Sequence, residues 1–330
     1  MSHMRTLSHI DYTVAWISAL SAELTAAICA LDNVHPALPQ NPQDSNSYTL
    51  GDIAGHNVVL VCLPAGQHGT NSAATVAGQL RYSFPAIRYG LMVGIGGGAP
   101  SERHDIRLGD VVVSIPGKSS NGVIQYDFGR TVAEGRFICD SILNAPPQIL
   151  LAAVSTVRAN HNTGTRQLDS FLSQGKFISL GPRFAHQGVQ NDILYRPDYD
   201  HVGAHDTCVM CEETRQAQRP ARESSRPMVH YGTIASGNQI MRHGQTRESC
   251  RKELDVLCFE MEAAGLMNSL PCLVIRGICD YADSHKNKSW QEYAAVSAAA
   301  YAKELLSAVV ADSLGTIQES RTYSGAQSKV

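Results

Sequence analysis

Unbroken runs of apolar residues, with little polar alternation, are the most prominent pattern along this chain. The run at residues 272–280, CLVIRGICD, is rich in β-branched and other apolar side chains. Such runs are typical of strands that are covered on both faces. Further strands are expected at residues 12–17, 46–53, 56–63, 90–93, 111–115 and 228–234.

Helices are expected where alanine-rich segments or apolar residues at helical spacing occur between these runs. One begins near Ala22 with Ser21 as its cap. Others are expected at residues 71–82, 148–159 and 290–311. Strands that alternate with helices favour an α/β fold, and 330 residues allow one large α/β domain or two small ones.

Acidic residues stand at two points where the apolar pattern ends. Asp280 closes the run at 272–280 beside Cys279, and ligands of open α/β sheets gather at such strand ends. Glu260 and Glu262 precede an alanine-rich stretch that is expected to be helical. A carboxylate among apolar neighbours is costly unless it is paired, so Glu262 and Asp280 are candidates for chemistry. The alternative is structural: Glu262 beside a helix N-cap and Asp280 capping a strand.

Two further features have both a functional and a structural interpretation. Glu23 falls in the first turn of the helix that begins near Ala22, where the helix dipole favours an anion. The glycine run at 94–98, GIGGG, lets backbone approach a ligand closely. Its spacing does not fit a dinucleotide fingerprint, and a plain tight turn is the alternative.

Residues 181–227 lose the apolar periodicity and are interpreted as a long excursion from the core. Four residues there have side chains that could hold zinc, in the spacing H-x3-H-x2-C-x2-C: His201, His205, Cys208 and Cys211. A single CxxC pair is not specific. Reduced loop thiols and solvated histidines are the alternative.

Composition narrows the class of protein. The chain is 43% hydrophobic and 17% charged with a formal net charge of -3, which gives no electrostatic footprint for nucleic acid or an anionic membrane. No apolar run reaches the roughly 18–20 residues of a membrane span, and no signal peptide is recognised. Nine scattered cysteines fit reduced thiols in a cytoplasmic protein. Residues 1–10 are expected to be a cloning scar and lead, 11–311 one domain, and 312–330 a disordered tail.

Five separated stretches, in order, resemble the nucleoside phosphorylase and nucleosidase superfamily. The resemblance is closest to methylthioadenosine nucleosidases, and it extends to the nucleoside-phosphorylase-like domains of fungal receptor-type proteins. The stretches are ALSAEL at 19–24, GIGGG at 94–98 with GDVV at 109–112, ASGN at 235–238, EMEAA at 260–264 and RGICDYAD at 276–283. The resemblance implies a three-layer α/β/α sandwich around a mixed, partly barrel-like sheet.

The resemblance also implies the reaction, cleavage of a ribosyl C1′–N bond, and roles for single residues. Asp280 matches the acid that meets purine N7, Glu262 the carboxylate that grips the ribose, and Glu23 the carboxylate that orients water. The remaining positions implied to bind substrate are Met261 under the sugar, Ile240, Met241 and Asn238 near the base, Trp290 over the 5′ end, and Glu260, Gly96, Ile95 and Cys279. No metal or organic cofactor is implied, and a homo-oligomer, dimer or hexamer, is expected.

Departures from the family pattern favour water as the nucleophile. Ile95 replaces the usual serine or threonine of the glycine segment, and the first turn after the strand at 12–17 lacks the phosphorylases' arginine. The sequence therefore predicts a purine nucleosidase, with adenosine as the favoured substrate. A phosphorylase using Arg103, Arg107 or Arg130 and a non-catalytic nucleoside sensor stay open. Tyr126 and Phe128 lie in a loop that is expected to reach a partner's 5′ pocket.

Overall fold

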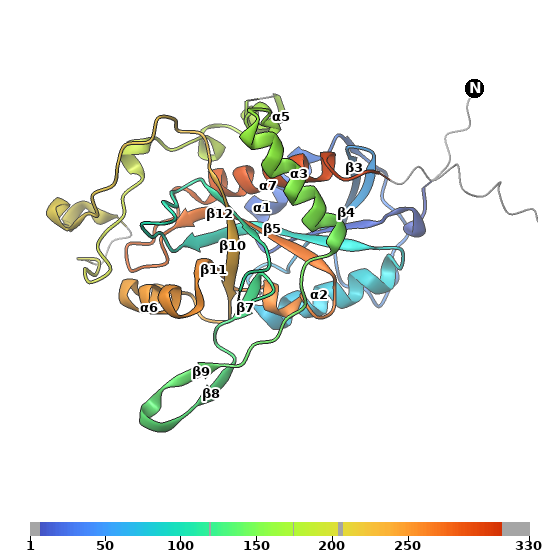
Figure 1. The fold of residues 1–330 in the computed structure, drawn as a ribbon. Coiled ribbons are helices and arrows are strands. Elements are labelled where there is room, and N and C mark those ends of the chain that lie inside the picture. Colours follow the sequence, from blue (N-terminus) through green and yellow to red (C-terminus); the bar gives the residue numbers. More distant parts are fainter. Residues whose placement is uncertain (1–6, 119, 174, 204–206, 312–330) are drawn as a thin grey trace, which may run out of the picture.

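One mixed sheet of ten strands runs through the middle of the chain, with helices on both faces (Figure 1). The computed structural model describes residues 7–118, 120–173, 175–203 and 207–311. The strands of this sheet are β1 (Val14–Ser18), β2 (Asn33–Val34), β3 (Tyr48–Ile53), β4 (His56–Cys62), β5 (Tyr89–Gly98), β6 (Val111–Ser114), β7 (Val123–Gln125), β10 (Val229–Ser236), β11 (Val256–Glu260) and β12 (Cys272–Asp280). The helices are α1 (Ser21–Ala30), α2 (Thr70–Ser83), α3 (Gln148–Asn162), α4 (Gln167–Leu172), α5 (Gly175–Ile178), α6 (Gly244–Leu254) and α7 (Gln291–Ser307).

Strand β5 closes part of the sheet into a barrel. It pairs in parallel with β12 and β1, and its end pairs antiparallel with β11, where Cys258 faces Gly98 and Phe259 faces Gly97. Strands β11, β10, β6, β12 and β5 thus form a closed ring, while β1, β4, β3 and β2 continue outward as an open sheet. The expected mixed, partly barrel-like sheet is confirmed.

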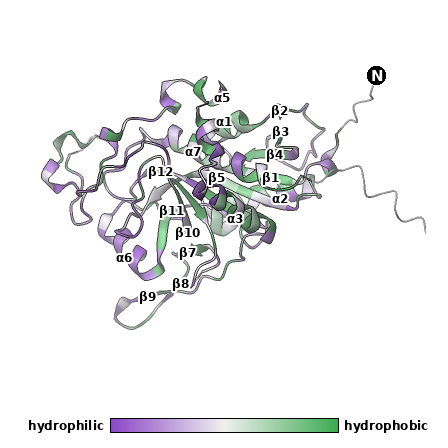
Figure 2. Cartoon of the chain, turned by 45° about the horizontal axis from the view of Figure 1, so that its top comes forward, coloured by the Kyte–Doolittle hydropathy of each residue, from purple (hydrophilic) through white to green (hydrophobic). Residues whose placement is uncertain are grey.

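Both faces of the central strands are buried, which explains their unbroken apolar sequences. Successive residues of a strand point to opposite faces. Val14 and Trp16 of β1 join a core cluster with α1, α3 and α7, whereas Ala15 and Ile17 join one with α2. Figure 1 shows α1, α3 and α7 on one side of the sheet and α2 on the other. Hydrophobic colouring is concentrated on the central strands and hydrophilic colouring on α6 (Figure 2).

Two local expectations were wrong, and one helix was not expected. The glycine run at 94–98 is no turn, because β5 continues through it to Gly98 and pairs with β12 and β11. The alanine-rich stretch after Glu262 is only a short 3₁₀ turn, Ala263–Gly265. Helix α6 is polar on most of its surface, and the apolar pattern did not indicate it. The expected tail, 312–330, lies outside the described residues.

The excursion at 181–227 has no α-helix or β-strand in its described part, only short 3₁₀ turns and one bridge between Tyr195 and Gln216. Two arginines fasten its end to the body of the chain. Arg222 contacts both carboxylate oxygens of Asp110 at 2.7 Å, and Arg219 donates to the hydroxyl of Tyr281 at 2.9 Å. In Figure 1 this segment lies beside the barrel end of the sheet.

A hairpin of β8 (Gly129–Thr131) and β9 (Phe137–Cys139) projects from the body (Figure 1). Phe128 at its base is 57% exposed, whereas Tyr126 is buried against Phe259 and donates its hydroxyl hydrogen bond to the backbone oxygen of Gln239 at 2.7 Å. Of these two residues, only Phe128 is free to meet a partner chain. Among the described helices, none combines the length and the hydropathy needed to cross a membrane.

Candidate active site

A cavity of about 380 Å³ opens where β1, β5, β11 and β12 end. It brings together acidic side chains that are far apart in the sequence, among them Glu23, Glu262 and Asp280. The other expected site residues that line it are Ile95, Gly96, Ile240, Met241, Glu260, Met261 and Cys279. Asn238 and Trp290 do not line it.

Glu23 is fixed by backbone groups at the start of α1. Its Oε2 accepts hydrogen bonds from the N–H groups of Ala19 at 2.6 Å and Leu20 at 3.0 Å, and its Oε1 accepts from Ile95 at 2.8 Å. Burial raises the pKa of Glu23, and Arg276 together with these hydrogen bonds offsets part of the rise. The result is an immobile, buried carboxylate that faces the cavity and binds a proton more readily than an exposed one.

Arg276 is the shared cation of three buried carboxylates, those of Glu260, Glu262 and Glu23. It lies in the middle of β12, is fully buried, contacts the carboxylate of Glu260 directly, and approaches Glu262 at 3.7 Å. Glu260 in turn accepts from the N–H of Glu262 at 3.1 Å. Sequence reasoning missed Arg276, although a single charge within an apolar strand was the signal, since such a charge requires a buried partner.

Glu262 is the carboxylate most strongly affected by this environment. Burial raises the pKa of Glu262 to about 7; Arg276 opposes the rise, and the nearby Glu260 and Glu23 add to it. The backbone N–H of Gly69 donates a hydrogen bond to Oε1 of Glu262 at 3.4 Å. A carboxyl group in this condition gains or loses its proton near neutral pH.

Asp280 ends β12 with both oxygens engaged. The N–H of Ala282 donates to Oδ1 at 2.9 Å, the thiol of Cys279 donates to Oδ2 at 3.1 Å, and the ammonium of Lys286 lies 2.8 Å from Oδ2. Burial alone would lower the pKa of Lys286, but Asp280 outweighs it and raises that pKa. Lys286 was not expected at the site, because its position depends on the course of the loop after β12.

Two glycines of β5 leave the space that these side chains occupy. A Cβ on Gly94 would stand 2.5 Å from both Arg276 Nη1 and Glu23 Oε1. A Cβ on Gly97 would stand 2.7 Å from Asp280 Oδ1. Both distances are too short for real contacts. Glycine at these positions therefore allows the side chains of Arg276, Glu23 and Asp280 to lie against the backbone of β5.

The rim of the cavity is cationic, in contrast to its acidic interior. Arg242 and Lys288 are exposed there, together with His68 and the partly buried Lys286. Ile240, 58% exposed, and Met241 add apolar surface on the same side. The cavity thus combines apolar, acidic and cationic surfaces.

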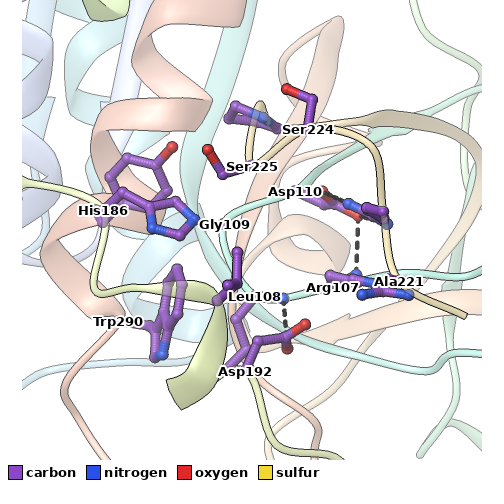
Figure 3. A pocket seen from close by; sticks show the side chains of 14 residues that line it. Arg107, Leu108, Gly109, Asp110, His186, Asp192, Ala221, Ser224, Ser225 and Trp290 are labelled. Carbon is purple, nitrogen blue, oxygen red and sulfur yellow. Dashed lines mark hydrogen bonds and ion pairs between the residues drawn. The ribbon is translucent and has the colours of Figure 1, made fainter. Parts of the chain in front are cut away.

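Trp290 lines a second cavity, of about 260 Å³, which Figure 3 shows from close by. It stands there beside His186, with its Nε1 donating to the backbone oxygen of Asn191 at 3.3 Å. The excursion fills the space over Trp290, so this tryptophan does not cover the cavity of Asp280. Asn238 is exposed and accepts from the N–H of Thr70 at 3.0 Å.

The three arginines considered for phosphate lie away from the acidic cavity. Arg107 lines the second cavity and pairs with Asp105 at 2.8 Å, Arg130 pairs with Asp140 at 3.6 Å on the projecting hairpin, and Arg103 is exposed elsewhere. None of the three lines the cavity that holds Glu23.

Comparisons with known proteins agree with this geometry. A family model described as the phosphorylase superfamily matches residues 13–312. A nucleotide-binding leucine-rich repeat (NLR)-like protein of Hyaloscypha variabilis is 44% identical over 304 residues, covering 91% of this chain and 30% of that protein. ATP nucleosidase Cap17 of Escherichia coli (strain KTE188) is 35% identical over 297 residues, covering 87% and 49%. The chain thus spans 30% and 49% of the length of these two relatives.

A shorter relative and a solved structure match over most of their own length. The 5'-methylthioadenosine/S-adenosylhomocysteine nucleosidase of Mycobacterium bovis is 30% identical over 261 residues, covering 78% of this chain and 82% of that enzyme. Futalosine hydrolase of Helicobacter pylori shares the fold with a TM-score of 0.58 at 16% identity, covering 91% of this chain and 99% of that one.

Proposed function

The chain belongs to the phosphorylase superfamily, and from that premise we propose that it is a nucleosidase that hydrolyses the N-glycosidic bond of a purine nucleoside. The observation that carries the proposal is that Glu23, Glu262 and Asp280 line one cavity. In the reaction, a water oxygen bonds to C1′ as the C1′–N bond breaks. The bond electrons go to the base, Asp280 gives a proton to purine N7, and Glu23 takes the proton of water.

Water, rather than phosphate, is the proposed nucleophile because the interior of the cavity is acidic. Arg276 does not line the cavity, and its charge is already shared by Glu260, Glu262 and Glu23. A phosphate dianion beside Glu23 would add repulsion without a free cation to offset it. The raised pKa of Glu23 suits a group that must accept a proton from water.

Glu262 is proposed to hold the ribose hydroxyls. Its charge would also favour a sugar that becomes cationic in the transition state. The pKa of about 7 means that a substantial fraction of Glu262 is ionised at neutral pH. A bound ribose that donates hydrogen bonds to the carboxylate would increase that fraction.

The rim supports a substrate with an anionic 5′ end, an adenine nucleotide, as a second candidate beside adenosine. Arg242, Lys286 and Lys288 gather where such phosphates would lie, and one relative is an ATP nucleosidase. Lys286 lies 2.8 Å from Asp280, so it stands between the proposed acid and the phosphates.

The test measures base release from adenosine, 5′-methylthioadenosine, AMP and ATP, with and without inorganic phosphate. Free adenine without phosphate is the expected result. Release only with phosphate would support a phosphorylase, and saturable binding without release would support a sensor. Lys288→Glu should raise KM for ATP and leave KM for adenosine unchanged, whereas Lys118→Glu, an exposed lysine outside the cavity, should change neither. An equal loss with both substrates would contradict the phosphate role of the rim.

A further inference from the structure

Three side chains of the excursion converge at a point outside the nucleoside cavity. His201, Cys208 and Cys211 each offer one ligand atom, and these atoms all lie within 4.8 Å of one another. In a tetrahedral zinc site, bonds of about 2.3 Å to sulfur and 2.0–2.1 Å to nitrogen place ligand atoms roughly 3.5–3.8 Å apart. Shortening the distances between these ligand atoms by about 1 Å would therefore give the geometry of a zinc site.

The backbone around the two cysteines already has the form that such a site requires. Residues Cys208–Met210 form a 3₁₀ turn, and the N–H of Cys211 donates to the backbone oxygen of Cys208 at 3.0 Å. In this turn, side chains three residues apart lie on the same side, so both sulfurs point one way. The Nε2 of His201 lies 3.2 Å from the backbone oxygen of Thr207, which places the ring directly beside this turn.

An independent observation comes from His285, in the loop after β12. His285 is only 7% exposed, yet neither ring nitrogen has a hydrogen-bond partner among the described residues, and the carboxylate of Asp283 lies beyond hydrogen-bond range, 3.7 Å from Nδ1. Buried polar groups are rarely left without a partner, because that costs the lost hydration. The ring stacks on Tyr195 with centroids 4.0 Å apart, and its centroid is 5.6 Å from that of His201. His285 and Cys208 line the same cavity.

We propose that His201, Cys208, Cys211 and His285 bind one Zn²⁺ ion. Two thiolates and two imidazoles are a ligand set that zinc prefers. The two thiolates neutralise the ion, which suits a half-buried position. His205, in the same stretch of sequence, lies outside the described residues and is not assigned.

The proposed ion joins the excursion to the loop that follows Asp280. His285 directly precedes Lys286, the partner of Asp280. Bound zinc therefore fixes the loop that carries the rim cations, and its removal should loosen that loop without removing any group of the nucleoside cavity. This role does not depend on which nucleoside is cleaved.

The experiment measures metal content in the reduced, chelator-free protein by inductively coupled plasma mass spectrometry. We expect about one zinc per chain, lost in the double variant Cys208→Ser/Cys211→Ser. The matched control is Cys250→Ser, a partly buried thiol outside the cluster that should retain the metal. Zinc-free wild-type protein that also fails to bind added zinc would overturn the proposal, as would unchanged zinc content in the double variant.

Cobalt substitution keeps the test independent of how the variants fold. The wild-type protein loaded with Co²⁺ should show a thiolate-to-metal charge-transfer band and the d–d bands of a tetrahedral ion; their absence would refute thiolate ligation. His285→Gln should weaken zinc binding at least about 10-fold in competition with a chromophoric chelator. Unchanged affinity would refute His285 as the fourth ligand.

Discussion

Replacing Glu262 by glutamine tests the electrostatics of the cavity, because glutamine keeps the shape of the side chain and removes its titration. The pKa of Glu262 rises from an ordinary 4.5 to about 7 in the folded chain. The folded state therefore binds more protons than the unfolded state between these values. The free energy of unfolding must fall as the pH rises through this window, by about 3 kcal/mol in total.

The expected result is a difference between wild type and variant that depends on pH. From pH 5 to pH 8, Glu262→Gln should gain up to about 3 kcal/mol of stability relative to wild type, because it lacks the cost of ionising Glu262. Urea unfolding at each pH measures this, and Trp16 and Trp290, both buried, report it by fluorescence. Any slope that remains in the variant belongs partly to Glu23, whose pKa is also raised.

Glu248→Gln is the matched control, because its shift has the opposite sign. A hydrogen bond from Arg251 lowers the pKa of Glu248, so this group is ionised in both states above pH 5. Its contribution to stability is lost only as the pH falls through its folded pKa, and the variant should run parallel to wild type from pH 5 to pH 8. If the Glu262→Gln curve also ran parallel to wild type, the reasoning about burial and repulsion in the cavity would be refuted.

Four other variants test single parts of the site. Asp280→Asn should lower kcat at least about 100-fold with intact folding, the usual scale for loss of a general acid; near-normal turnover would reject that role. Glu23→Gln should lower kcat while the dissociation constant for nucleoside, measured by calorimetry, stays close to that of wild type, and lost binding would contradict water positioning. Arg276→Met should cost about 3–5 kcal/mol in urea unfolding, since three carboxylates lose their shared cation; an unchanged urea midpoint would argue against that pairing. Gly97→Ala should lower kcat about 100-fold through displacement of Asp280, and full activity would show that the strand accommodates a Cβ there.

The fold was predictable where apolar side chains carry the pattern. The run at 272–280 became β12 with the same bounds, and the runs at 46–53 and 56–63 became the hairpin of β3 and β4. Both faces of these strands pack against helices or neighbouring chain, so apolar side chains are needed along them and mark them in the sequence. The second half of β5 could not be predicted in this way, because glycine has no side chain to show a pattern and its strand pairing is made by the backbone alone.

The grouping of the candidate site residues in one cavity was predictable for residues next to strand ends and less so for residues on loops. Glu23, Glu262 and Asp280 meet in one cavity because strand order brings those ends together. Trp290 follows a loop whose course is set by the excursion, and its ring therefore faces His186 instead. Lys286 and Arg242 reach the rim through loops as well, and no spacing in the sequence relates them to Asp280.

Two glycines of β5 limit which amino-acid replacements this sequence can accept. At Gly94 and Gly97, the space beside the backbone is taken by side chains of Arg276, Glu23 and Asp280. Any amino-acid replacement of a glycine adds atoms, so no conservative exchange exists at these two positions. In a saturation library screened for folding, they would be expected to tolerate fewer residues than Glu23 and Asp280, whose isosteric amides keep the shape of the side chain.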